Sequence, residues 1–148
     1  MADWIPAIFD RTQADVDFAL SKLREWKKYN TSNVYDLKGC FNVSDINRIE
    51  NNIRYLSDAL SELYYFSHLE TKTWDITGIP NQGDIDRIIQ NTRTLILSIC
   101  EDAPELPNTL LTIDDVNCIE FNLHKIKMIL DEMTTSSIEC GTFDCGEV

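Results

Sequence analysis

The sequence predicts an all-α protein, a four-helix bundle made of two repeated αα-hairpins related by a pseudo-twofold axis. Three observations predict this class. A helix-start pattern occurs four times, an apolar stripe with helical spacing follows each start, and Trp74 follows Trp4 by 70 residues at the head of a second, similar unit. We expect one helical domain over residues 1–133, with repeat units at about 1–70 and 71–133, and then an acidic, flexible tail at 134–148.

Each predicted helix start has Thr or Asn, then Asp three residues later, then a β-branched aliphatic residue. The Thr or Asn side chain can accept a hydrogen bond from a first-turn N–H group, and the Asp can reach back as in a capping box. The Asp charge also suits the positive end of the helix dipole. The expected helix-capping residues are Thr12, Asp15, Asn42, Asp45, Asn81, Asp84, Thr112 and Asp115.

The first helix is expected at 12–29, because Val16, Ala19, Leu23 and Trp26 then lie on one face. Trp26 extends this stripe and is expected in the core. The second helix is expected at 42–67, where apolar residues again alternate in steps of three and four. Its stripe is Ile46, Ile49, Ile53, Leu56, Leu60 and Leu63.

The third helix is expected at 81–100 and the fourth at 112–133, with the same spacing of apolar residues. Additional apolar positions widen the stripes, as the core of a bundle requires. The third stripe is Ile85, Ile88, Thr92, Leu95 and Ile99. The fourth stripe is Val116, Ile119, Leu123, Ile126, Leu130 and Met133.

Three asparagines recur at one offset beside the apolar stripes: Asn52, Asn91 and Asn122. Asn is a poor helix former, so helix propensity does not explain the recurrence. Our hypothesis is that these amides hydrogen-bond a neighbouring helix or linker and set the packing register. A ligand-binding role is the less favoured alternative.

Arginine and tryptophan supply the candidate binding residues. Arg48 and Arg87 share one repeat offset, and exposed ion pairs with Asp45 and Asp84 are favoured over a partner-binding role. Both Trp4 and Trp74 stand in the segments that lead into the helices, where they are expected to cover the two ends of the bundle. The alternative for the tryptophans is a stacking platform for a glycan or a partner chain.

Composition and motifs exclude several function classes. The net charge of −12 over 148 residues argues against nucleic acid or an anionic membrane surface as the main partner. No phosphate-binding loop, nucleophile elbow or His-Glu-x-x-His motif occurs, and the five irregularly spaced cysteines fit neither a disulfide framework nor a zinc site. We therefore predict no catalytic residue, no metal and no cofactor.

Targeting signals are also not expected. No apolar run approaches the roughly 20 residues of a membrane-spanning helix. Residues 1–11 contain two aspartates and no basic stretch before an apolar one, unlike a signal peptide. The chain is therefore expected to be made in the cytoplasm.

The repeated pattern resembles a known module. The stretches Asp10–Asp17 and Asp45–Leu56, with Trp74, Ile79–Pro80 and Asp84–Ile88, are similar to a helical module of tail and other virion structural proteins from bacteriophages and prophages of Gram-positive, Clostridia-like bacteria. The resemblance covers most of residues 3–130. It implies a non-enzymatic structural or attachment component of a virion, with other tail subunits or further copies of itself as partners, and it brings no catalytic residues.

Two other functions stay open at this point. A receptor- or carbohydrate-binding module would use the two lead-in tryptophans on a host-surface glycan. A small acidic cytoplasmic regulatory protein would use its charge to mimic or block a basic partner.

Overall fold

The computed structural model describes residues 2–29, 37–63, 66, 68–100 and 104–142, with side chains for all of these except 26–29 and 134–142. Four α-helices follow one another along the chain: α1 Gln13–Tyr29, α2 Val43–Leu63, α3 Gln82–Ile99 and α4 Ile113–Thr142. The described residues contain no β-strand, so the predicted all-α class with four helices is confirmed. The predicted core position of Trp26 falls outside the described side chains.

Each helix begins within one residue of its predicted start. At α3, Asp84 N donates to Asn81 Oδ1 at 2.9 Å while Asn81 N donates to Asp84 Oδ2 at 3.0 Å, which is a complete capping box. The same reciprocal pair is made by Thr12 with Asp15 and by Thr112 with Asp115.

The start of α2 differs in one bond. Asn42 N donates to Asp45 Oδ2 at 2.8 Å, as in the other starts. The side-chain amide of Asn42, however, donates to Leu37 O and Cys40 O. This side chain therefore closes the turn before α2 and makes no bond of the predicted kind to the Asp45 N–H group.

Helices α2, α3 and α4 pack against one another in all three pairs and enclose the core. Most core side chains come from the predicted stripes, because one face of each helix carries its apolar residues. Leu106 and Leu110, from the segment before α4, also lie in the core, whereas Leu63 of the second stripe is 45% exposed. The largest completely buried apolar residues are Ile49, Ile53, Leu56, Leu60, Ile88, Leu95, Ile119 and Leu123.

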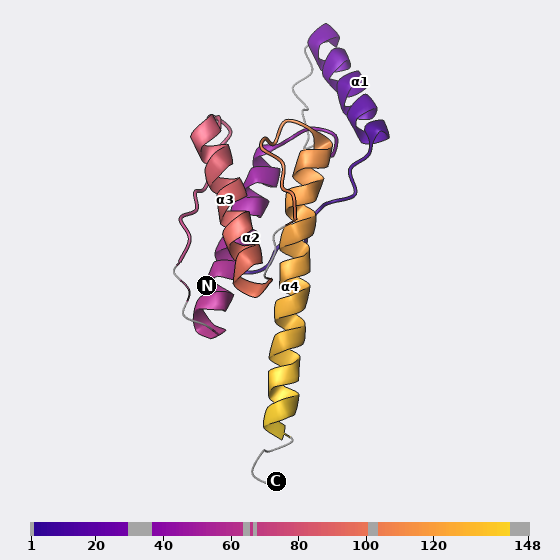
Figure 1. Ribbon diagram of the computed structural model, residues 1–148. Helices are drawn as coiled ribbons and strands as arrows, with labels where there is room; N and C mark the ends of the chain where they lie inside the picture. Colours follow the sequence, from indigo (N-terminus) through magenta and orange to yellow (C-terminus); the bar gives the residue numbers. More distant parts are fainter. Residues whose placement is uncertain (1, 30–36, 64–65, 67, 101–103, 143–148) are drawn as a thin grey trace.

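The three core helices run in the same direction, as Figure 1 shows. Residues 68–81 and 104–112 each return along the bundle before the next helix begins. The third and fourth helices were expected to form one αα-hairpin, which requires antiparallel helices joined by a short loop. Helices α3 and α4 instead run in the same direction, so this hairpin is not formed. The internal repeat itself stays a prediction.

Helix α4 is longer than predicted. It continues to Thr142, so residues 134–142, expected as part of a flexible tail, are helical. The segment 134–140 contains no Gly or Pro that would end a helix. Its polar composition alone therefore did not predict that the helix would end at residue 133. In Figure 1 the last turns of α4 extend well past the ends of α2 and α3.

Helix α1 lies outside the three-helix core (Figure 1). Its first turn is held by the residues just before α2. Lys38 Nζ lies 3.0 Å from Asp10 Oδ1, and Gly39 packs so closely that a Cβ atom there would lie 2.1 Å from Asp15 O. Only glycine fits this contact between two backbone segments.

We predict that Gly39→Ala destabilises the attachment of α1. The added methyl group overlaps the Asp15 carbonyl, and such overpacking costs about 1–3 kcal/mol. Hydrogen exchange over residues 13–25 should become faster, while Ser21→Ala, at an exposed position of the same helix, should leave it unchanged. Equal exchange in Gly39→Ala and the parent protein would contradict this contact.

Candidate functional site

The N-terminal segment 3–11, here called the first lead-in, lies along the α2–α4 interface. The Asn52 side chain binds both backbone groups of Ile5, with Ile5 N donating to Oδ1 at 3.0 Å and Nδ2 donating to Ile5 O at 2.8 Å. Asn117 of α4 binds both backbone groups of Arg11 in the same way. Two carboxamides thus pair with an extended backbone much as a neighbouring β-strand would.

A buried ion cluster lies beneath the first lead-in. Arg48 of α2 binds Glu120 of α4 with both Nε and Nη2, at 2.5 and 2.9 Å, and its Nη2 also lies 2.6 Å from Asp45 Oδ1. Arg11 Nη1 lies 2.8 Å from Glu120 Oε2, and its Nη2 lies 2.9 Å from Asp45 Oδ1. Two cations and two anions balance, and each of the four residues is less than a tenth exposed.

The segment 69–74, the second lead-in, lies along the α2–α3 interface in a similar way. Trp74 N donates to Asn47 Oδ1 at 2.7 Å, and Asn47 Nδ2 donates to Trp74 O at 2.8 Å. At the other end, Asn91 Nδ2 donates to Glu70 O at 2.9 Å. Asparagines from two helices therefore hold this segment as well.

A second charged cluster lies beneath the second lead-in. Arg87 of α3 binds the buried carboxylate of Glu50 through both terminal nitrogens, and this hydrogen bonding raises the pKa of Arg87. The Trp74 indole N–H also donates to Glu50, at 3.2 Å. Lys72 Nζ lies 2.6 Å from Asp84 Oδ1, and its hydrogen bond, with that of the Asn81 N–H group, lowers the pKa of Asp84.

The two clusters use the same offsets from the helix caps. In each, an Arg six residues after one cap binds a Glu eight residues after the cap of the neighbouring helix. In each, a lead-in cation binds the Asp three residues after the first cap. The matched pairs are Arg48–Glu120 with Arg87–Glu50, and Arg11–Asp45 with Lys72–Asp84.

These contacts correct the roles expected for the arginines. Arg48 does pair with Asp45, but the pair is buried and shared with Glu120, so it is not a surface ion pair. Arg87 binds Glu50 in place of Asp84. Both guanidinium groups pair with buried carboxylates, and breaking these pairs in order to bind a partner would leave a buried charge unpaired.

The two tryptophans are not equivalent either. Both are half-buried and pack against the core. Trp4 meets the ring of Tyr55 edge-on with centroids 5.7 Å apart, whereas the backbone of Trp74 takes the place that Arg11 has in the first lead-in. Both rings therefore contribute part of their surface to packing on the core, and the glycan-binding role stays a prediction.

The asparagines predicted to set the register separate into two kinds. Asn52 and Asn91 hold the lead-ins, as described above. Asn122, at the same offset in α4, donates instead to Cys118 O of its own helix at 2.8 Å. Within the described part of the chain, the Asn122 side-chain oxygen accepts no hydrogen bond.

Sequence reasoning missed the partners of this network. Arg11, Asn47, Glu50, Asn117 and Glu120 were not singled out as candidates, although they carry most of its bonds. The sequence did contain a usable signal, because Glu50 and Glu120 stand at the same offset from their helix caps and each follows a residue of the apolar stripe. A carboxylate repeated at such a position points to a buried cation.

Other kinds of site receive no support from the described residues. No group of three or more His, Cys, Asp or Glu side chains there has the arrangement of a metal site. None of the four helices, so far as the structure describes them, is long and apolar enough to cross a membrane. No family model, curated protein or solved structure matches this chain.

We predict that Glu120→Gln lowers the free energy of unfolding by about 3–5 kcal/mol, because Arg11 and Arg48 then share a single buried carboxylate. Urea unfolding followed by circular dichroism measures the change. Glu25→Gln removes an exposed carboxylate that pairs with Lys22 and should leave the midpoint nearly unchanged. An unchanged midpoint for Glu120→Gln would show that the cluster contributes little.

We also predict that Asn52→Leu costs about 1–3 kcal/mol, because both backbone groups of Ile5 lose their partner. Asn91→Leu should be destabilising as well, since Glu70 O loses a donor. The matched control is Asn122→Leu, which breaks bonds only within α4 and should cost less. Unchanged or higher stability of the first two variants, with a single folded state, would refute the register hypothesis.

Proposed function

We propose that the protein is a non-enzymatic structural or attachment component of a bacteriophage tail or phage-like particle, acting through protein–protein interfaces. The resemblance of its repeats to virion structural modules supports the proposal that the chain is part of such a particle. The observation that carries the interface role is α1, a helix that projects from the bundle without a helix packed along it in the described residues.

Helix α1 has the properties of an arm that a partner covers. Phe18 is 57% exposed and Leu20 is 45% exposed, which is unusual for large apolar side chains of one short helix. A helix of 17 residues is only marginally stable in water, and most helices in proteins depend on packing of their apolar face. A neighbouring subunit that packs against α1 would bury these side chains and stabilise the helix.

Helix α4 provides a second projection. Figure 1 shows its last turns leaving the core at one end, while α1 projects beyond the opposite end. A compact core with helices projecting at both ends suits a subunit that is contacted by neighbours on two sides. Such a subunit would fix the position of one neighbour relative to the other.

The interior also favours a building block over an enzyme. The carboxylates of Glu50 and Glu120 are committed to arginine partners, and the lead-ins are pinned by amides at both ends. General acid–base chemistry needs a group that can exchange protons with a substrate, and ions locked in buried pairs do not serve this purpose well.

The alternatives have weaker support. A carbohydrate-binding module needs exposed rings, and both Trp4 and Trp74 pack on the core. The acidic regulatory protein is supported by the net charge of −12, which a basic partner would complement.

The proposal predicts that mass spectrometry of phage-like particles purified from the source culture finds this chain at a fixed ratio to the tail proteins. Particles that lack it, from cells whose lysate contains it, would defeat the particle role and favour the acidic regulator.

The interface role has its own test. Phe18→Ser combined with Leu20→Ser should strongly reduce incorporation of the chain into particles, with the bundle still folded. Lys22→Ser combined with Arg24→Ser changes exposed polar residues of the same helix and should be incorporated normally. Equal incorporation of both double variants would mean that α1 is not the interface.

A further inference from the structure

A groove of about 450 Å³ lies on α2 between the two lead-ins and is here called the α2 groove. Ile5 of the first lead-in and Lys72 and Thr73 of the second lead-in border it. Its base is one face of α2, because the helix residues that line it recur at helical spacing. These residues are Ser44, Asn47, Arg48, Asn51 and Arg54. The volume falls within the range of small-ligand sites.

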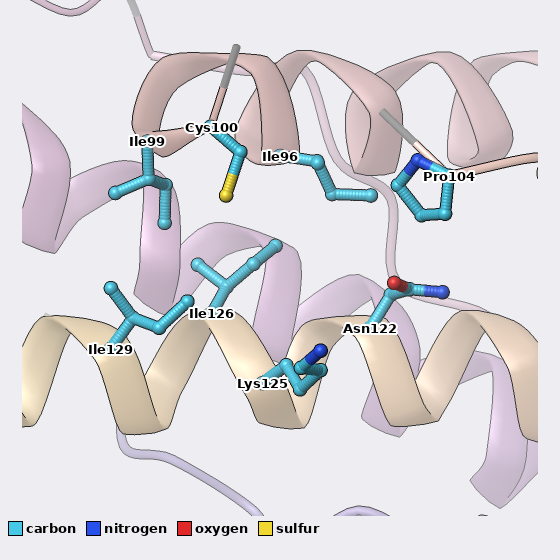
Figure 2. Close-up of a pocket in the computed structure, with 8 residues that line it drawn as sticks. All are labelled: Ile96, Ile99, Cys100, Pro104, Asn122, Lys125, Ile126 and Ile129. Atoms are coloured by element: carbon cyan, nitrogen blue, oxygen red, sulfur yellow. The ribbon is translucent and has the colours of Figure 1, made fainter. Parts of the chain in front are cut away.

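The lining of the α2 groove has the opposite charge to the chain. Three of its eight lining residues are cationic and none is acidic, whereas the chain has a net charge of −12. The pocket between α3 and α4 in Figure 2 is of a different kind, with four isoleucines and a single charged residue, Lys125, around it. Positive charge gathered in one groove of an acidic protein favours the binding of an anion there.

Arg54 brings a cation to the α2 groove that has no anion of its own. Its Nε donates to Thr71 Oγ1 at 3.0 Å. Within the described residues, no carboxylate pairs with the Arg54 guanidinium group, and its two terminal nitrogens make no hydrogen bond. The bond through Nε orients the guanidinium plane, which leaves both terminal nitrogens for the two oxygens of a planar anion.

Arg48 adds a donor without giving up its buried pairs. Its Nε and Nη2 bind Glu120 and Asp45, and no described residue accepts a hydrogen bond from its Nη1. In the described residues, Arg87 Nε is the only buried side-chain nitrogen or oxygen that lacks a partner, so Arg48 Nη1 must be open to solvent. The side chain is only 9% exposed, so the ion cluster holds this nitrogen in a fixed position in the groove lining.

The equivalent surface of α3 includes an anion. A smaller cavity of about 250 Å³ lies there, and three of its lining residues have the same offsets from the helix cap as residues of the α2 groove. Asp86 lines that cavity together with Arg93, whereas the α2 groove has a neutral residue in place of the aspartate. The uncompensated cation is therefore particular to α2. The matched pairs are Asp86 with Asn47, Gln90 with Asn51 and Arg93 with Arg54.

We propose that the α2 groove binds a small monocarboxylic acid, with its carboxylate on the terminal nitrogens of Arg54. Arg48 Nη1 and the hydroxyl groups of Ser44 and Thr73 make no hydrogen bond to the described residues, and they supply donors for a second oxygen-bearing group of the ligand. This site goes beyond the proposed structural role and does not depend on it.

Charge decides between a carboxylate and a phosphate. Arg48 is offset by Asp45 and Glu120 in its cluster, and Lys72 lies 2.6 Å from Asp84. One uncompensated positive charge, that of Arg54, therefore remains in the groove. A carboxylate brings one negative charge, whereas a phosphate group brings about −1.5 to −2 and would leave the site negative.

The test uses N-acetylglycine, which has one carboxylate and one amide carbonyl, and follows the Nε–H signals of the arginines by NMR. Added N-acetylglycine should shift the Arg54 signal and leave that of Arg93 unchanged. Neutral N-acetylglycinamide should shift neither signal, because it lacks the charge. Inorganic phosphate should bind more weakly than N-acetylglycine.

Variants complete the test, with binding followed at the side-chain amide of Asn51 in the groove. Arg54→Gln should weaken binding of N-acetylglycine at least tenfold, the loss expected for a charged hydrogen-bonded pair, while the protein stays folded. The matched control Arg93→Gln should bind as the parent protein does. The Phe18→Ser and Leu20→Ser protein should also bind normally, which separates this inference from the role of α1.

Four results would overturn the proposal. They are no Arg54 shift at high millimolar N-acetylglycine, equal shifts at Arg54 and Arg93, unchanged affinity of Arg54→Gln, and phosphate binding as tight as that of the acid. Tighter binding of a glycine-ending peptide with a free C-terminus would also overturn it, because the groove would then be a site for the end of another chain.

Discussion

The carboxylate of Glu120 makes the contacts on which the rest of the structure depends. It binds Arg48 of α2 and Arg11 of the first lead-in at once, and it is 1% exposed. One buried group on α4 thereby fixes the neighbouring helix and the N-terminal segment. A lone buried carboxylate would be costly, but two guanidinium groups and Asp45 complete a neutral cluster. The Glu50 cluster does the same for α2, α3 and the second lead-in.

Parallel packing explains why acidic caps recur. The N-termini of α2, α3 and α4 meet at one end of the core, where their helix dipoles place like partial charges together. Asp45, Asp84 and Asp115 stand in these first turns and offset that charge. Two of them also bind lead-in cations, so the residues that start the helices also attach the segments between them.

Local features were predictable and long-range ones were not. The helix starts followed from Thr or Asn with a nearby Asp, because capping is settled within one turn. The direction of the helices did not follow, since an apolar stripe has the same spacing in parallel and antiparallel bundles. Arg48 appeared to be a surface residue because its decisive partner lies 72 residues away. The contrast between Asn52 and Asn122 was invisible for the same reason, as only the fold brings Ile5 to one of them.

Ile8 N of the first lead-in donates a hydrogen bond to Glu120 Oε1, a residue 112 positions further along the sequence. This separation affects when the core can close during synthesis. The first lead-in leaves the ribosome before its partners on α4, since Glu120 lies 112 positions after Ile8. Until then Arg11 has no Glu120 to bind, and the α2–α4 interface does not exist. Closure of the α2–α4 interface over the first lead-in therefore waits until α4 has been made, and pairings this distant are slow to form. In a crowded polysome, nascent chains with an unbound lead-in would be exposed to one another during that interval.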